Sequence, residues 1–196
     1  AVRALKAKVV LIGNNFDDAL KESKTFCKKN KVNFIHPFDD PLVIAGQGTV
    51  GMEISEQFPE NLYAVFVAVG GGGLIAGIGA YLNKVHPNVK IIGVEAADSA
   101  GLYASISAGK RVKLKEVGLF ADGAAAKQIG KNNYELIKNF LDDSITVDTD
   151  EICAAVKDTF LETRTVPEPT GALALAGLKK YISQKRIKNK NLIATY

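Results

Sequence analysis

VAVGGGGLIAG, residues 67–77, places four consecutive glycines between two apolar segments. A glycine inside a strand or a helix costs roughly 0.5–1 kcal/mol relative to alanine, so four in a row need a reason. The run before them, residues 63–69, has the composition of a buried strand, and the run after them, to about Val85, has that of an apolar helix. The stretch therefore predicts a strand, a glycine loop and a helix.

This order of elements predicts an anion site. The backbone N–H groups of the loop and of the first helical turn converge, and the helix dipole there favours negative charge. Side chains at these positions would obstruct an approaching phosphate, whereas glycines let the main chain close around it. The alternative is a close contact between strand and helix that holds no ligand.

Strand-like and helix-like segments alternate along the rest of the chain. Because each strand-like run is almost continuously apolar, we expect an α/β fold in three layers, with a mostly parallel sheet flanked by helices. Asn14 and Asn15 are expected to cap the helix that follows the first strand. The expected strands cover residues 7–13, 32–36, 63–69, 88–96, 143–147 and 191–196.

The composition is that of an ordinary globular protein. Of the 196 residues, 47% are hydrophobic and 23% are charged, with a net charge of +4. No apolar run is long enough to span a bilayer, and the basic residues between 179 and 190 lack the interleaved aromatics of a nucleic-acid surface. Cys27 and Cys153 are too few for a disulfide framework or a zinc site, which fits a cytoplasmic protein. We therefore expect no membrane and no nucleic-acid partner.

The glycine loop alone does not say which phosphate it binds. Gly71, Gly73 and Ala76 satisfy the looser G-x-G-x-x-A dinucleotide fingerprint, and Glu95 ends the next expected strand, about where a ribose-binding acid would lie. This fingerprint is weak by itself, and a P-loop is excluded because no lysine followed by Ser or Thr ends the loop. A non-catalytic module that binds phosphate or a dinucleotide remains one interpretation.

Longer motifs indicate which class of phosphate-containing ligand the glycine loop binds. VGGGGLIAGIGAYL, IIGVEAADSA, VGLFADGAAAKQIG and VPEPTGALALAG follow one another in the chain, and FIHPFDDPLVIAGQGT precedes them. Together they resemble the threonine dehydratases, pyridoxal-phosphate enzymes of the tryptophan-synthase-β-like fold, over essentially the whole chain. The EAADSAGL, GLFADG and EICAAVKDTF segments look more like the biosynthetic than the catabolic type.

The resemblance implies a binding site for pyridoxal 5'-phosphate. It places the cofactor's phosphate at Gly70, Gly71, Gly72 and Gly73, with Leu74 as the first helical residue. It also places Gly123 along one side of the cofactor ring and Glu168 near that ring, and it assigns Gln47 and Gly48 to a loop on the substrate side. The alternatives are turn glycines at 48 and 123 and a solvated loop carboxylate at 168.

The resemblance assigns no catalytic residue and no metal to this chain. The family's Schiff-base lysine lies in a Ser-Phe-Lys-x-Arg-Gly-type motif, and no lysine here has that context. Glu95 matches an acidic position that binds a divalent cation in some relatives, but Gly101 stands where the accompanying aspartate would be. The chain looks like an internal fragment in which residues 1–40 belong to the small domain and 41–196 to the large cofactor-binding domain, without a regulatory domain.

The expected activity follows from this family. It is the deamination of L-threonine to 2-oxobutanoate and ammonia, the first step of isoleucine biosynthesis, in a cytoplasmic homo-oligomer, by resemblance a homotetramer. We expect the fragment to be inactive alone. A serine dehydratase or serine racemase of the same fold is the alternative enzyme.

Overall fold

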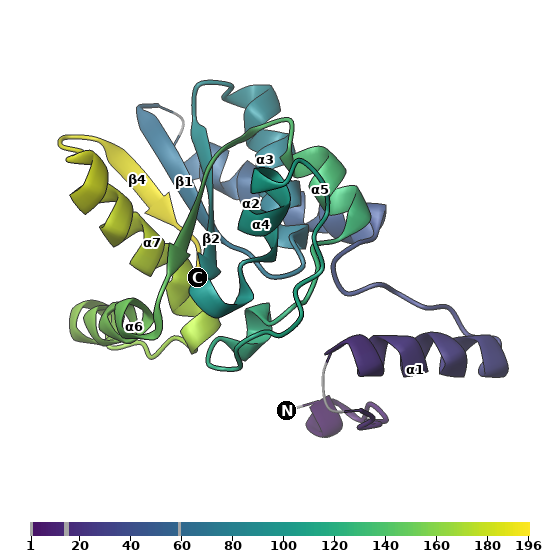
Figure 1. Cartoon of the computed structure of the whole chain (residues 1–196). Helices are drawn as coiled ribbons and strands as arrows, with labels where there is room; N and C mark the ends of the chain where they lie inside the picture. The colour runs from purple at the N-terminus through teal and green to yellow at the C-terminus, as the bar shows by residue number, and fades with distance from the viewer. Residues whose placement is uncertain (1, 14–15, 59) are drawn as a thin grey trace. The chain divides into compact units, whose positions relative to one another are not determined.

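The computed structural model describes residues 2–13, 16–58 and 60–196. The chain divides into two compact units, residues 1–35 and 36–196 (Figure 1). Among the helices that the structure describes, none has both the length and the apolar character needed to cross a bilayer.

The first unit contains a short 3-10 helix, η1 (Val2–Leu5), and the helix α1 (Phe16–Asn30). The strands expected at residues 7–13 and 32–36 are wrong, because these residues have no strand conformation, and Leu11 is 84% exposed. A strand is stable only when a neighbouring strand pairs with it, and the described residues of this unit supply none. Asn14 and Asn15, the expected caps, lie outside the described residues.

The second unit is built on a parallel sheet. Its strands run in the order β3-β2-β1-β4, and each neighbouring pair is parallel, with Val65 opposite both Ile91 and Ile193. Four of the six expected strands are thus confirmed, as is the α/β fold class. The strands are β1 (Leu62–Ala68), β2 (Lys90–Ala96), β3 (Leu141–Val147) and β4 (Asn191–Ala194).

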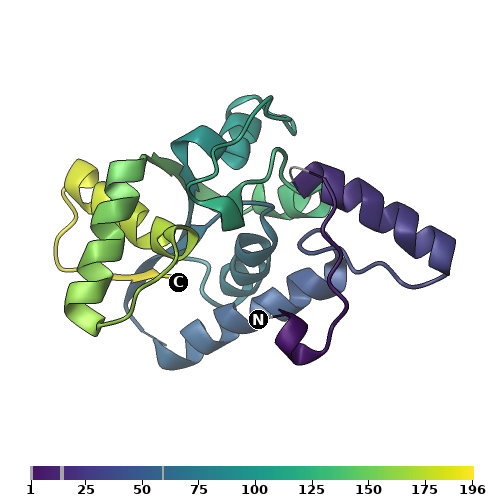
Figure 2. The same ribbon diagram turned by 90° about the horizontal axis from the view of Figure 1, so that it is seen from below.

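Helices cover both faces of this sheet (Figure 1). Side chains alternate along β1, so that Ala64 and Phe66 pack toward α7 while Val65 and Val67 pack toward α3. Figure 2 shows α6 and α7 together on one side and α2 and α3 on the other. The first face carries α6 (Thr149–Thr163) and α7 (Pro169–Lys185), and the second carries α2 (Pro41–Gln57), α3 (Gly73–Val85), α4 (Gly101–Ser107) and α5 (Lys131–Ile137); η2 (Ala97–Ser99) and η3 (Asp122–Ala124) are single 3-10 turns.

Gln47 and Gly48 do not form the expected loop. Both lie inside α2, which begins where the Asp40 carboxylate accepts a hydrogen bond from the backbone N–H of Leu42 at 2.8 Å. Gly48 packs directly on α3, since a Cβ on Gly77 would lie 2.6 Å from the Gly48 nitrogen. Gly48 of the AGQGT segment therefore allows close packing of two helices and does not form a turn.

Candidate functional site

The glycine loop lies at the edge of the sheet where parallel α/β proteins bind ligands. From β1 through β2 to β3 the chain moves in one direction across the sheet, whereas β4 lies on the opposite side of β1. The order of strands therefore reverses between β1 and β4, and such reversals form ligand-binding crevices at the carboxyl ends of the strands. The loop between Ala68 and Gly73 joins the carboxyl end of β1 to α3 at this place.

The backbone N–H groups of residues 70–75 have no acceptor among the residues that the structure describes. α3 begins at Gly73, one residue before the expected start. Its N-cap is Gly72, which has a φ of +89° and, as a glycine, has no side chain to cap the helix. Gly72, Gly73 and Ile75 are buried. Unpartnered buried amides are rare in folded proteins, so this row of donors indicates a ligand with acceptor oxygens. The dipole of α3 favours an anion at the same place.

Two of the glycines are required by Phe38. A Cβ on Gly71 would lie 2.3 Å from Cγ of the Phe38 ring, and a Cβ on Gly73 would lie 2.9 Å from the Phe38 carbonyl oxygen. The aromatic side chain thus fills the space that a larger residue would need. The sequence led us to expect that side chains in this loop would obstruct the ligand. In the structure, a side chain at position 71 or 73 would collide with Phe38 before it reached a ligand.

The other two glycines contact η3 and the segment that follows it. A Cβ on Gly70 would lie 2.8 Å from the Ala124 Cα, and one on Gly72 would lie 2.9 Å from the Ile129 Cδ1. Four glycines in succession therefore allow the loop to pack closely on three separate segments while its amide groups remain unpaired.

Gly123 and Glu168 are brought together on the adjoining side. A Cβ on Gly123 would lie 3.2 Å from Glu168 Oε1 and 2.9 Å from the Thr170 hydroxyl oxygen. Since Ala124 follows Gly123 and packs on Gly70, the glycine loop, η3 and the start of α7 meet here. Glu168 is the exposed N-cap of α7 and forms no side-chain capping bond.

Thr170 is a further candidate site residue that could not be singled out from the sequence. Its hydroxyl oxygen is buried and has no hydrogen-bond partner in the described part of the chain. Thr170 is the threonine of the quoted VPEPTG stretch. A cavity of about 410 Å³ adjoins this segment, and Glu168, Thr159, Thr163 and Tyr196 are among its lining residues. Three threonines, one tyrosine and one carboxylate thus line open space next to the start of α7.

The role of Glu95 in the structure differs from the two considered for it from the sequence, which were binding a ribose and ligating a cation. Its side chain is fully buried at the end of β2, where its two carboxylate oxygens accept hydrogen bonds from the N–H groups of Leu102 (2.7 Å) and Tyr103 (2.8 Å). Burial raises the pKa of Glu95 to about 7, and these backbone bonds lower it in part. Glu95 therefore caps the start of α4, which occupies the oxygens that a ribose or a cation would need. Within residues 2–13, 16–58 and 60–196 no cluster of three or more metal-ligating side chains occurs.

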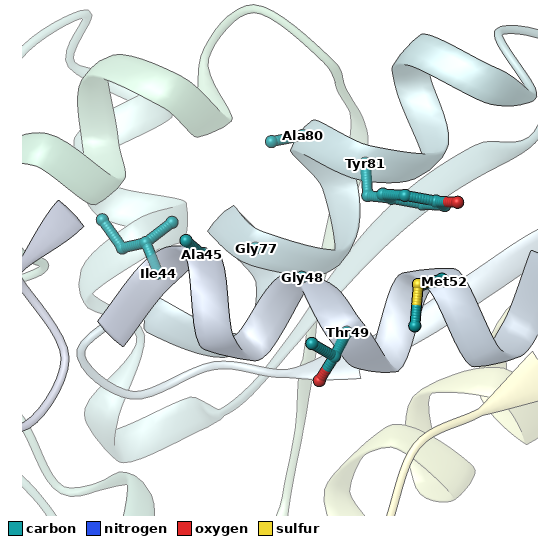
Figure 3. A pocket seen from close by; sticks show the side chains of 8 residues that line it. All are labelled: Ile44, Ala45, Gly48, Thr49, Met52, Gly77, Ala80 and Tyr81. Carbon is teal, nitrogen blue, oxygen red and sulfur yellow. The ribbon is translucent and has the colours of Figure 1, made fainter. Parts of the chain in front are cut away.

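A second cavity, of about 350 Å³, lies at Gly48 between α2 and α3 (Figure 3). Figure 3 shows Ile44 and Met52 of α2 and Ala80 and Tyr81 of α3 around it. None of its lining residues is charged. An amino-acid substrate carries an ammonium and a carboxylate group, and this groove offers neither of them an ionic partner. The substrate-side role of Gln47 and Gly48 stays a prediction.

Comparison with known proteins defines the class. The family described as "Pyridoxal-phosphate dependent enzyme" matches residues 1–195, and the chain belongs to this family. The phosphate ester of pyridoxal phosphate fits the observed donors, because it is an anion with acceptor oxygens. The expected family and cofactor are thus confirmed.

Individual relatives narrow this class further. The chain is 52% identical over 191 residues to "Threonine dehydratase, mitochondrial" of Schizosaccharomyces pombe, covering 97% of this chain and 32% of the relative. It is 50% identical over 187 residues to "L-threonine dehydratase biosynthetic IlvA" of Burkholderia multivorans, covering 95% of this chain and 37% of the relative. The solved structure of the processed form of threonine deaminase isoform 2 from Solanum lycopersicum matches with a TM-score of 0.94 and 44% identity, covering 98% of this chain and 56% of that one. The chain thus spans about a third of the length of these curated relatives.

Proposed function

We propose that this chain supplies the cofactor-phosphate site of an enzyme that deaminates L-threonine to 2-oxobutanoate and ammonia, as a step of isoleucine biosynthesis. The observation that carries the proposal is the row of unpartnered backbone N–H groups at residues 70–75. The names of the relatives that are 50–52% identical support the substrate.

Each site residue has a definite task in this proposal. Bound pyridoxal phosphate supplies an electron sink for the carbanion that forms when the substrate loses its α-proton. The N–H groups of Gly70, Gly71, Gly72, Gly73 and Leu74 donate to the phosphate oxygens and hold the cofactor in register. They bind and orient, and they transfer no proton.

The second wall of the proposed site is formed by Gly123, Glu168 and Thr170. Gly123 leaves room for one side of the cofactor ring, and Glu168 and the Thr170 hydroxyl supply polar groups near that ring. The close approach of these residues to one another supports their grouping. No residue of this chain is proposed as the covalent anchor or the general base, so the 196 residues alone are expected to show no turnover of threonine.

The binding part of the proposal is tested with the ¹⁵N-labelled chain. Pyridoxine 5'-phosphate carries an alcohol in place of the aldehyde and does not react with surface lysines, so it isolates the phosphate interaction. It should shift the amide signals of residues 70–75, whereas pyridoxine, which lacks the phosphate, and NAD should not. Gly71→Ala should abolish the response because its Cβ would collide with Phe38, while Gly46→Ala, whose Cβ meets nothing within 4 Å, should keep it. A response to NAD alone would favour the dinucleotide interpretation.

The catalytic part is tested with the product of the full reading frame that contains these residues. L-threonine, L-serine and D-serine are offered separately, and 2-oxo acid, ammonia and serine enantiomers are measured. Faster turnover of threonine than of serine supports the proposal. Interconversion of the serine enantiomers would favour the racemase alternative, since solved serine racemases also match this chain, one from Dictyostelium discoideum at 31% identity. Absence of all these products would contradict both enzymes.

We also propose that the protein works in the cytoplasm as a homotetramer. Both points rest on the family resemblance. Light scattering of the same full-length product and fractionation of the source cells test them, and a monomer or an organellar location would contradict them.

A further inference from the structure

The carbonyl group of Gly71 is held by two donors from the start of α5. It accepts hydrogen bonds from the N–H of Gly130 at 3.0 Å and from Nδ2 of Asn133 at 2.8 Å. Asn133 Nδ2 also donates to the carbonyl oxygen of Phe38 at 3.0 Å. The Asn133 side chain is 0% exposed, and its Oδ1 has no partner in the described part of the chain. An unpartnered buried oxygen is costly, so an asparagine here needs a reason beyond packing.

The reason concerns the neighbouring N–H of Gly72. The chain has no cis peptide bond among its described residues. In a trans peptide the C=O and the N–H point to opposite sides of the backbone. Fixing the Gly71 carbonyl therefore fixes the direction of the Gly72 N–H, one of the donors without an acceptor among the described residues.

This peptide needs such a restraint because glycines stand on both sides of it. Glycine populates positive and negative φ about equally, so a peptide between two glycines rotates with little steric resistance. The Gly130 N–H supplies one hydrogen bond to the carbonyl oxygen of this peptide, and the Asn133 side chain supplies a second one. Two donors from α5 and the residue before it therefore restrain the rotation of the peptide. The start of α5 is itself held in place, since the Asp39 carboxylate accepts from the N–H groups of Lys131 at 2.9 Å and Asn132 at 2.8 Å.

We propose that Asn133 is a positioning residue that directs the Gly72 N–H toward a phosphate monoester. The inference rests on the proposed function of the glycine loop. Asn133 acts through the backbone, and it needs no contact with the ligand. Its hydrogen bond to the Gly71 carbonyl sets the affinity of the loop for phosphate, and its bond to the Phe38 carbonyl holds the side chain in that position.

The test measures the affinity of the ¹⁵N-labelled chain for inorganic phosphate and for pyridoxine 5'-phosphate in three variants. Asn133→Ala removes both donated bonds, and Asn133→Asp keeps the shape but donates nothing when ionised. At pH 8 both should bind about tenfold more weakly than the wild type, the effect of losing one net hydrogen bond. Asn132→Ala is the matched control, because its side chain is exposed at the preceding position of α5 and makes only a long hydrogen bond to the Asp39 carbonyl oxygen, at 3.4 Å, so this variant should bind as the wild type does.

The pH dependence separates positioning from a loss of structure. A protonated aspartate donates one hydrogen bond, so the affinity of Asn133→Asp relative to the wild type should recover when the pH falls to 5, while that of Asn133→Ala should not. Circular dichroism checks that each variant is folded, and Ile152→Val, a conservative change in the buried side of α6, shows how mild destabilisation alone affects binding. If the folded Asn133 variants bind phosphate as tightly as the wild type at pH 8, this inference is overturned and the proposed function stands. A wild-type chain that responds to neither ligand overturns both.

Discussion

Glu95 couples the stability of the second unit to pH in an unusual direction. Burial raises the pKa of this carboxyl group from 4.5 to about 7, although the N–H groups of Leu102 and Tyr103 donate to it. The folded state therefore holds a proton between these two values that the unfolded state has released. Linkage then requires the free energy of unfolding to fall as the pH rises through this interval.

The magnitude follows from the width of the interval. Each pH unit between the two pKa values removes about 1.4 kcal/mol, so the stability that is fully present below pH 4.5 is reduced by about 3 kcal/mol above pH 7. This is a large share of the 5–15 kcal/mol that is usual for a domain. Most buried carboxylates in ion pairs act in the opposite direction, because their pKa values are lowered on folding.

Glu95→Gln isolates this contribution. The amide keeps the size of the side chain and does not titrate, so the difference in unfolding free energy between the wild type and the variant carries the pH dependence of Glu95 alone. Urea unfolding is measured at pH 4.5, 5.5, 6.5 and 7.5 for both proteins. The wild type should lose about 3 kcal/mol relative to the variant across this range. A constant difference would refute the raised pKa, and a difference that grows in favour of the wild type would show that the helix N–H groups outweigh the burial.

Three further changes test how the helices are held. Asp39→Asn removes the charge that accepts from the start of α5 and should cost about 1 kcal/mol in urea unfolding; no loss would contradict the capping role. Asp148→Ala breaks the capping box that Asp148 forms with the third residue of α6 and should cost about 1 kcal/mol, whereas Thr149→Ala should cost less; equal losses would argue against the box. Gly79→Ala would place a Cβ 2.0 Å from Cε2 of Phe140 and should cost roughly 1–3 kcal/mol, and Phe140→Leu should relieve part of that cost in a double-mutant cycle; additive costs would show that this contact is not the cause.

The sheet could be predicted from the sequence because its strands carry a local signal. The runs around Val65 and Ile92 are almost continuously apolar, which is typical of strands buried on both faces, and the run around Ile145 is rich in β-branched residues. The same signal at residues 7–13 was misleading, since a strand also needs a partner that the local sequence does not show. The loop predicted at Gly48 was wrong for a related reason. A glycine signals a turn and a close helix crossing equally well, and only the position of Gly77 on α3 distinguishes the two.

The candidate site could be proposed from the sequence only where its residues share a local motif. Gly70, Gly123 and Glu168 lie in motifs that the family resemblance identified. The residues that hold the glycine loop lie far away in the sequence. The hydrogen bond between Asn133 and Gly71 joins residues 62 positions apart, and no pattern in either segment indicates that they meet.

The start of α3 differs from the starts of the neighbouring helices in one respect that bears on its function. Carboxylates of the protein accept hydrogen bonds from the first N–H groups of four helices in this unit: Asp40 at α2, Glu95 at α4, Asp39 at α5 and Asp148 at α6. α7 has no side-chain cap, but it begins with a proline, which lacks one of the donors. α3 begins with glycines and receives no side-chain cap. A carboxylate of the protein there would occupy the amides and repel a phosphate, and no described side chain takes that place, which is the arrangement that the proposed phosphate site requires.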